Sequence, residues 1–75
     1  MSPPRVKISD CSYQHLVRVA QRCGFVIVEG GKHCKVKLPT GDFITTIPRH
    51  ARLKRETVRG IVKQFNEFGG KIKIS

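Results

Sequence analysis

Two short apolar segments on either side of a glycine pair constrain the fold more than any other feature of this chain. Residues 25–29 are β-branched and aromatic apart from one acid, a composition that favours a strand. The glycines at 30 and 31 supply a turn, and a second strand is predicted over 32–38. Alternate side chains of a strand point to opposite faces. One face of the second strand therefore carries three core residues: Cys34, Val36 and Leu38.

The opposite face of that strand carries His33, Lys35 and Lys37. A histidine that serves a core more often lies in the apolar set. An imidazole among ammonium groups instead suits a site that binds phosphate or cleaves a phosphodiester. The residues alone support two roles for His33 equally, catalysis and simple contact with phosphate.

Two helices are predicted around the strands. Ser9 or Asp10 is expected to cap the first helix, which runs to about Arg22 with an apolar stripe at helical spacing. The second helix is predicted over 54–68. Gly60 lies inside it, where glycine costs about 1 kcal/mol relative to alanine, so close packing is expected there.

The remaining segments complete a small α+β domain. Residues 39–42 form a turn, and a third strand follows over 43–47. Two amphipathic helices can cover one face of a three-stranded antiparallel sheet, which gives a two-layer α-β-β-β-α fold. The whole chain, 1–75, is interpreted as one domain with its core at about 9–69. Residues 1–8 are expected to be a loose arm, and residues 70–75 a short extension that is either an edge strand or a tail.

The charge of the chain points to a polyanionic partner. Its 75 residues include 15 Lys and Arg but 5 Asp and Glu, for a net charge of +10. Such an imbalance is typical of proteins that bind nucleic acid, an anionic surface or an acidic protein. The chain has no apolar run long enough for a membrane span and no apolar signal core near Met1, so a cytoplasmic protein without a membrane role is expected. The odd set of three cysteines favours reduced thiols.

Four short motifs in order resemble the HicA toxin family of toxin–antitoxin pairs. They are Leu16 with Gly24-Phe25, Gly31-Lys32-His33, Ile47-Pro48-Arg49-His50 and the segment 56–64. The resemblance covers about residues 9–69. It implies a fold like a double-stranded RNA-binding domain, a ribosome-independent mRNA interferase activity and neutralisation by a HicB-type antitoxin. It also implies that His33 is catalytic, while Lys32 stands where the family usually has serine.

The residues fit a cleavage reaction that needs neither a metal nor a cofactor. Such a reaction uses the 2′-hydroxyl of RNA as the nucleophile, and a histidine with an unperturbed pKa near 6.5 suits the proton transfers. Lysines near it can stabilise charge on phosphorus. The five acidic residues are scattered along the chain, which does not favour a Mg²⁺ site.

A second proton function is assigned to His50 or Lys32. For His50, the residues favour a different role, that of a hydrogen-bonded loop histidine orienting the third strand against the second helix. The RNA-binding set comprises Lys32, Lys35, Lys37, Arg49, Arg52, Arg55, Arg59 and Lys63. The last four basic positions, from Arg52 on, form a stripe beside the second helix that can hold phosphates, receive an acidic antitoxin or simply stay solvated.

The aromatic residues are interpreted as core rather than as base-stacking platforms; they are Tyr13, Phe25, Phe43, Phe65 and Phe68.

The expected protein is the toxin of a type II system, an endoribonuclease acting on mRNA. It is monomeric when free, or a hetero-oligomer with its antitoxin. Two alternatives stay open: a non-catalytic RNA-binding module of the same fold, and a basic subunit that docks an acidic protein.

Overall fold

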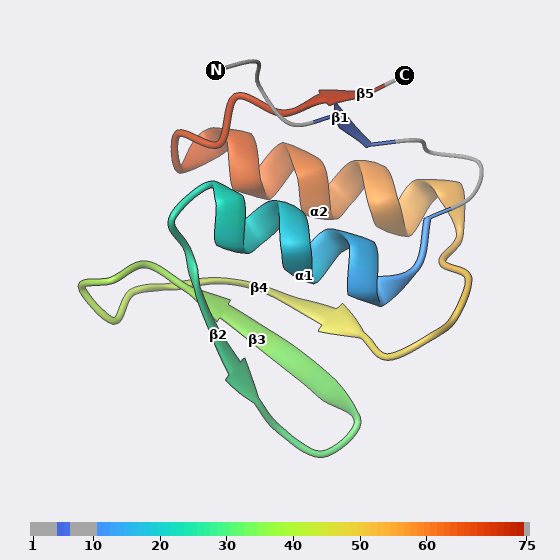
Figure 1. The fold of residues 1–75 in the computed structure, drawn as a ribbon, viewed down its shortest axis with the longest axis horizontal. Coiled ribbons are helices and arrows are strands. Elements are labelled where there is room, and N and C mark those ends of the chain that lie inside the picture. The colour runs from blue at the N-terminus through green and yellow to red at the C-terminus, as the bar shows by residue number, and fades with distance from the viewer. Residues whose placement is uncertain (1–4, 7–10, 75) are drawn as a thin grey trace.

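The computed structural model describes residues 5–6 and 11–74, and its elements follow the predicted order with one addition (Figure 1). The strands β2, β3 and β4 form an antiparallel sheet in that order, and both helices lie on one side of it. The prediction of an α+β fold with α-β-β-β-α order is confirmed. The elements are β1 (Arg5–Val6), α1 (Tyr13–Arg22), β2 (Val26–Glu29), β3 (His33–Lys37), β4 (Phe43–Pro48), α2 (Arg55–Glu67) and β5 (Lys73–Ile74).

Helix α1 begins later than its sequence predicts. Its cap is Ser12, whose hydroxyl accepts a hydrogen bond from the backbone N–H of His15 at 3.2 Å. The predicted caps, Ser9 and Asp10, lie outside the described residues. Gly24 ends the helix as expected, with a φ of 85° that glycine adopts without strain.

Helix α2 matches its predicted bounds closely. Gly60 within the helix and Gly70 just after it differ in how closely other atoms approach them. A Cβ built on Gly60 meets nothing within 4 Å, so the close packing expected there is wrong. The close approach occurs at Gly70 instead, where a Cβ would lie 2.8 Å from the carbonyl oxygen of Phe65. The Gly70 N–H donates to that same oxygen at 2.9 Å, which turns the chain back against the helix.

These two glycines are therefore expected to respond to alanine in opposite directions. Gly60→Ala should raise the free energy of unfolding by about 1 kcal/mol, because alanine is the better helix former and has room. Gly70→Ala should lower it by about 1–3 kcal/mol, because the new methyl group overlaps the Phe65 carbonyl. Urea unfolding followed by circular dichroism measures both changes. Equal effects of the two substitutions would contradict this assignment.

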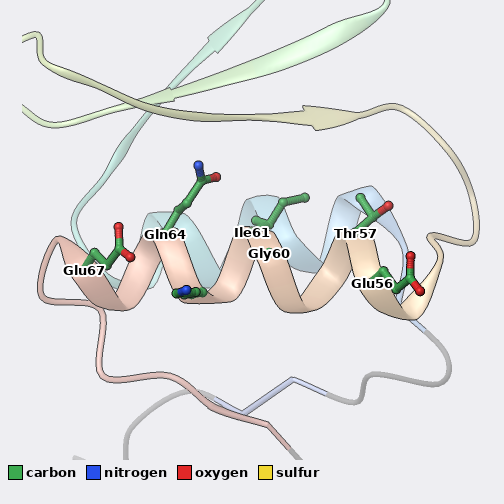
Figure 2. Close-up of a pocket in the computed structure, with 7 residues that line it drawn as sticks. Glu56, Thr57, Gly60, Ile61, Gln64 and Glu67 are labelled. Carbon is green, nitrogen blue, oxygen red and sulfur yellow. The ribbon is translucent and has the colours of Figure 1, made fainter.

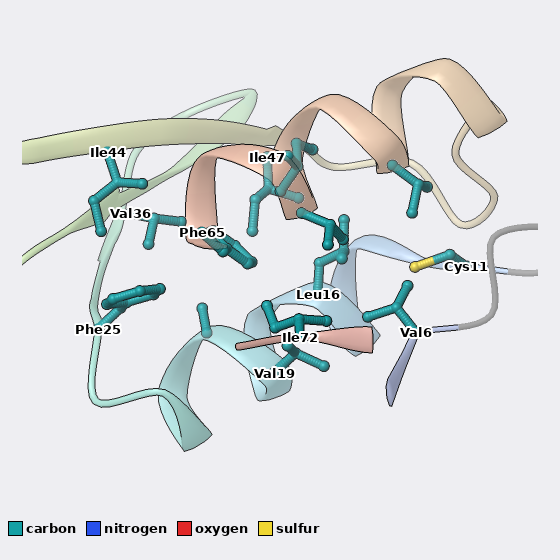
Figure 3. Close-up of a cluster of buried hydrophobic side chains, with 14 of the residues drawn as sticks. Val6, Cys11, Leu16, Val19, Phe25, Val36, Ile44, Ile47, Phe65 and Ile72 are labelled. Carbon is teal, nitrogen blue, oxygen red and sulfur yellow. The ribbon is translucent and has the colours of Figure 1, made fainter. Parts of the chain in front are cut away.

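The core lies between the sheet and the two helices (Figure 3). Leu16 of α1 and Phe65 of α2 are fully buried, together with Val36 and Ile47 from the sheet. The rings of Phe25 and Phe65 pack at a centroid distance of 5.5 Å, tilted by 55°. This tilt is close to the arrangement that aromatic pairs favour. The contact joins the residue before β2 to α2.

The register between β3 and β4 shifts by one residue, which changes the faces of β4. Val36 lies opposite Thr45, whereas Lys37 lies opposite Phe43, so Ile44 has no partner in β3. Both Ile44 and Thr45 are buried as a result, and Phe43 turns to the outer face with 54% of its surface exposed. The interpretation of Phe43 as core is therefore wrong.

Phe68 is also wrongly assigned to the core, since it is 40% exposed at the end of α2. Its place explains the error, because it follows the last turn of the helix and no longer shares the buried stripe that ends with Phe65.

A second, parallel sheet joins the two ends of the described chain. Arg5 and Val6 of β1 pair with Lys73 and Ile74 of β5. Figure 1 shows this pair on the far side of the helices from the three-stranded sheet. Val6 is fully buried, so residues 5–6 are not the loose arm that was expected.

The side chain of Asn66 fixes the approach to β5. Its amide nitrogen donates to the carbonyl of Ile72 at 3.1 Å, and its oxygen accepts from the Ile72 N–H at 2.6 Å. Both backbone groups of Ile72 are thereby satisfied while its side chain is buried against the helices. The C-terminal segment is thus an edge strand rather than a tail.

Within the described ranges, neither helix has the length and apolar character needed to span a lipid bilayer.

Candidate active site

His33 is the first residue of β3 and lies on the open face of the sheet. Its side chain is exposed, whereas Cys34 and Val36 are buried, so the predicted alternation along β3 is correct in the structure. In the register with β4, His33 lies opposite Pro48. The imidazole is therefore accessible from the side of the sheet that faces away from both helices.

The outer face of the sheet carries two further rows of side chains beyond His33. Lys35 lies between Val28 of β2 and Thr46 of β4. Lys37 lies between the two apolar side chains of the next row, Val26 and Phe43. The face therefore presents cations along its central strand, flanked mainly by apolar side chains.

Hydrogen bonds hold the backbone on both sides of His33. The Gly30 N–H donates to the His33 carbonyl at 3.3 Å, which closes the turn between β2 and β3. The Arg49 N–H donates to the Lys32 carbonyl at 3.4 Å, which ties that turn to the chain after β4. These contacts restrict the position of the imidazole before any ligand binds.

Arg49, predicted to bind RNA, is engaged within the protein. Its guanidinium forms an ion pair with the Glu29 carboxylate at 2.7 Å. A side-chain contact with Cys34 and then the charge of Glu29 raise the pKa of Arg49 above its ordinary value. Arg49 thus stays cationic and exposed, but its charge is shared with Glu29, and the pair joins β2 to the chain after β4.

A basic hollow adjoins Pro48, the register partner of His33. His50 and Arg52 both line it, so the structure brings these two predicted residues together. The backbone carbonyl of His50 accepts from the Tyr13 N–H at 3.2 Å, which ties the loop to α1 rather than to α2. The complete lining is Pro48, His50, Arg52, Leu53, Lys54 and Thr57.

Two members of the predicted basic stripe, Arg59 and Lys63, lie on a different surface from His33. Arg59 and Lys63 line a shallow hollow with Ile74 of β5, on the side of the helix away from the sheet. The structure therefore does not gather the predicted RNA-binding set on one surface. Lys32, Lys35 and Lys37 accompany His33, whereas Arg59 and Lys63 do not.

Figure 2 shows an open depression along α2, formed where Gly60 has no side chain. Two carboxylates, Glu56 and Glu67, line it together with Lys63. Acidic groups repel phosphate, so this depression is a poor candidate for an RNA site.

Sequence reasoning missed three residues of the sheet and of the hollow beside Pro48. Glu29 was not connected with Arg49, because an ion pair across 20 positions leaves no local pattern. Lys54 was assigned to the start of the second helix and not to the site, although it lines the hollow beside His50. Phe43 was hidden by the register shift, because regular alternation back from Ile47 places it inside.

Among residues 5–6 and 11–74, no three His, Cys, Asp or Glu side chains gather in a group that could hold a metal ion.

Comparison with known proteins adds one finding to this geometry. A family model described as the HicA toxin of bacterial toxin–antitoxin systems matches residues 13–66, more than two thirds of the chain. No curated protein and no solved structure matches the chain significantly. The matched segment runs from the first residue of α1 to the penultimate residue of α2 and includes His33. The chain therefore belongs to the HicA family, the toxins of bacterial toxin–antitoxin pairs.

Proposed function

We propose that this toxin is an mRNA interferase, an endoribonuclease that cleaves single-stranded RNA by acid–base chemistry at His33. The observation that carries the proposal is the exposed imidazole at the start of β3, on the same open face as Lys35 and Lys37. A histidine can exchange protons near neutral pH, and nearby ammonium groups favour a phosphate beside it.

The reaction is an internal transfer at phosphorus. The 2′-oxygen attacks the adjacent phosphate, the bond from phosphorus to the 5′-oxygen breaks, and a 2′,3′-cyclic phosphate and a free 5′-hydroxyl result. One proton leaves the 2′-hydroxyl and one reaches the departing 5′-oxygen. His33 performs one of these transfers, and His50 or Lys32 performs the other, while Lys35 and Lys37 hold neighbouring phosphates.

The antitoxin is proposed to be a HicB-type protein that inhibits by covering the His33 face. Charge complementarity supports this arrangement, because Lys32, Lys35 and Lys37 all accompany His33 on or beside that face. Acidic and apolar groups on the antitoxin would replace the phosphates and bases of RNA there. The proposed place of action is the cytoplasm, where mRNA is available.

A single 2′-deoxy substitution tests the reaction. Cleavage sites are first mapped on a long RNA, and an oligonucleotide spanning one site is then made with and without deoxyribose on the 5′ side of the scissile phosphate. With EDTA present, the all-RNA strand should be cut to the cyclic phosphate, and the substituted strand should stay intact at that bond. Cleavage of the substituted bond, or inhibition by EDTA, would contradict the mechanism.

The same cleavage assay also tests the alternative function, a non-catalytic RNA-binding module. Lys32, in place of the serine usual in the family, is the observation that favours this alternative. A folded protein that retains RNA on a filter but leaves every strand intact over hours would support binding alone.

A further inference from the structure

Phe43 is an aromatic side chain on the face that carries the candidate active site. It is 54% exposed and lies opposite Lys37, whose other neighbour is Val26. Burying a phenylalanine is worth about 1.5–3 kcal/mol, so its exposure forgoes much of a normal core contribution. Two neighbouring apolar side chains on this face, Val26 and Val28, are 43% and 40% exposed. Such an apolar cluster on a small protein is typical of a binding surface.

The register shift in β4 is what turns Phe43 outward. Ile44 and Thr45 both point into the core, and the strand resumes its alternation one residue out of phase. A regular strand would have placed the phenylalanine inside. Bulges that redirect a side chain in this way are frequent near functional sites.

The distance from Phe43 to His33 matches a short length of RNA. Lys37, the register partner of Phe43, lies four residues after His33 along β3, which is about 13 Å in an extended strand. Stacked nucleotides rise about 3.4 Å each along one strand, so about four of them span this interval, and fewer when the strand is extended. Lys35 lies midway, where a backbone phosphate would pass.

We infer that Phe43 is a base-stacking platform for single-stranded RNA, holding a base within about four nucleotides of the phosphate at His33. Lys35 and Lys37 would contact the phosphates between the two. The inference rests on the proposed function, and it names the substrate as a single strand lying along β3. Every base has a face that can stack on a ring, so Phe43 would add affinity without strict sequence preference.

Charge favours RNA over a second copy of this basic chain as the occupant of this surface. Lysines adjoin the apolar cluster, on a chain whose net charge is +10. The acid nearest in sequence, Asp42, lies in the preceding turn, where its carboxylate accepts a hydrogen bond from the Thr40 hydroxyl at 3.0 Å. Stacked bases joined by phosphates match alternating apolar and cationic groups.

Fluorescence of an introduced tryptophan tests this inference directly. The chain contains no tryptophan, so Phe43→Trp places a single reporter on the sheet face. Phe68→Trp is the matched control, because Phe68 is 40% exposed at the end of α2. Both are made with His33→Ala, so that binding is measured without cleavage, and each is titrated with a 12-nucleotide RNA of mixed sequence and with inorganic polyphosphate.

RNA should quench Phe43→Trp strongly and Phe68→Trp little, and polyphosphate should quench neither. In the same background, Phe43→Leu should raise the dissociation constant for RNA about fivefold or more, whereas Phe43→Tyr should keep it unchanged. In the active protein, Phe43→Leu should raise KM and leave kcat within about twofold. The titrations in the His33→Ala background measure binding alone, so failure of the cleavage proposal would not alter them.

Three results would overturn the inference. The first is equal quenching of the two reporters, or equal quenching by polyphosphate, which would indicate a charge effect alone. The second is unchanged RNA affinity in Phe43→Leu. The third is a change of molecular mass in solution with Phe43→Leu while RNA affinity stays constant, which would assign the apolar cluster to a contact between proteins. Circular dichroism of each variant shows that it is folded.

Discussion

Replacing His33 by alanine is expected to abolish detectable RNA cleavage while the protein stays folded. General acid–base catalysis by a positioned side chain contributes about 10²–10⁴-fold, and the substitution removes the imidazole that provides it. The fold should tolerate the change, because the side chain is exposed and the hydrogen bonds around it come from the backbone. Single-turnover cleavage of a labelled RNA gives the rate, and thermal unfolding gives the stability.

His15→Ala is the matched control for this prediction. His15 lies in α1, and the Ser12 cap binds its backbone N–H, so removing its side chain leaves the cap in place. Its cleavage rate should stay within about twofold of the parent protein. A folded His33→Ala protein that cuts RNA as fast as this control would refute catalysis by His33.

The pH dependence of the rate separates the two roles open to His50. If His50 supplies the second proton, His50→Ala should lose one limb of the pH–rate profile. If His50 only orients the loop through its backbone, the profile should keep its shape and stability should fall slightly. Lys32 remains the candidate for the second proton in that case.

The largest effect on stability is expected from Phe65→Ala. The ring is fully buried against Phe25, and a phenylalanine removed from a core costs about 3–5 kcal/mol. Small domains have a total free energy of unfolding of about 5–15 kcal/mol, so this one substitution removes a large share of it. Urea unfolding of the purified variant should show a much lower midpoint with a similar slope.

Phe68→Ala provides the comparison within the same helix end. This residue is 40% exposed three positions later, and surface substitutions usually change stability by about 0.5 kcal/mol or less. A loss of stability in Phe68→Ala equal to that in Phe65→Ala would contradict the burial that distinguishes them.

The local pattern of residues was sufficient to predict most of the candidate site. Period-two alternation in residues 33–37 placed His33 outward and Cys34 inward, as observed. Helical spacing identified the buried stripes of α1 and α2, which determine the face of the sheet that they cover. The resemblance to the HicA family, now confirmed over residues 13–66, rested on short motifs in these elements and in the connections between them.

The main features that the sequence did not reveal depend on contacts between separate parts of the fold. The Glu29–Arg49 ion pair joins β2 to the loop after β4, and Asn66 holds the backbone of Ile72. Neither contact follows from periodicity, because each requires two parts of the chain to be placed first. The side of α2 on which Arg59 and Lys63 lie relative to His33 also depends on tertiary packing, so the sequence did not reveal it.

The sequence by itself determined the identity of the two helices and the three central strands, the outward direction of His33 and the excess of positive charge. The first two depend on the spacing of side chains along a helix or strand, which is a local quantity, and the charge depends on composition alone. The tertiary structure decided the pairing of β1 with β5 and the register of β4 against β3. A register is set by which residues of two strands meet, and a slip of one position turns a side chain to the opposite face. That is why Phe43 lies beside Lys37 on the open face rather than in the core.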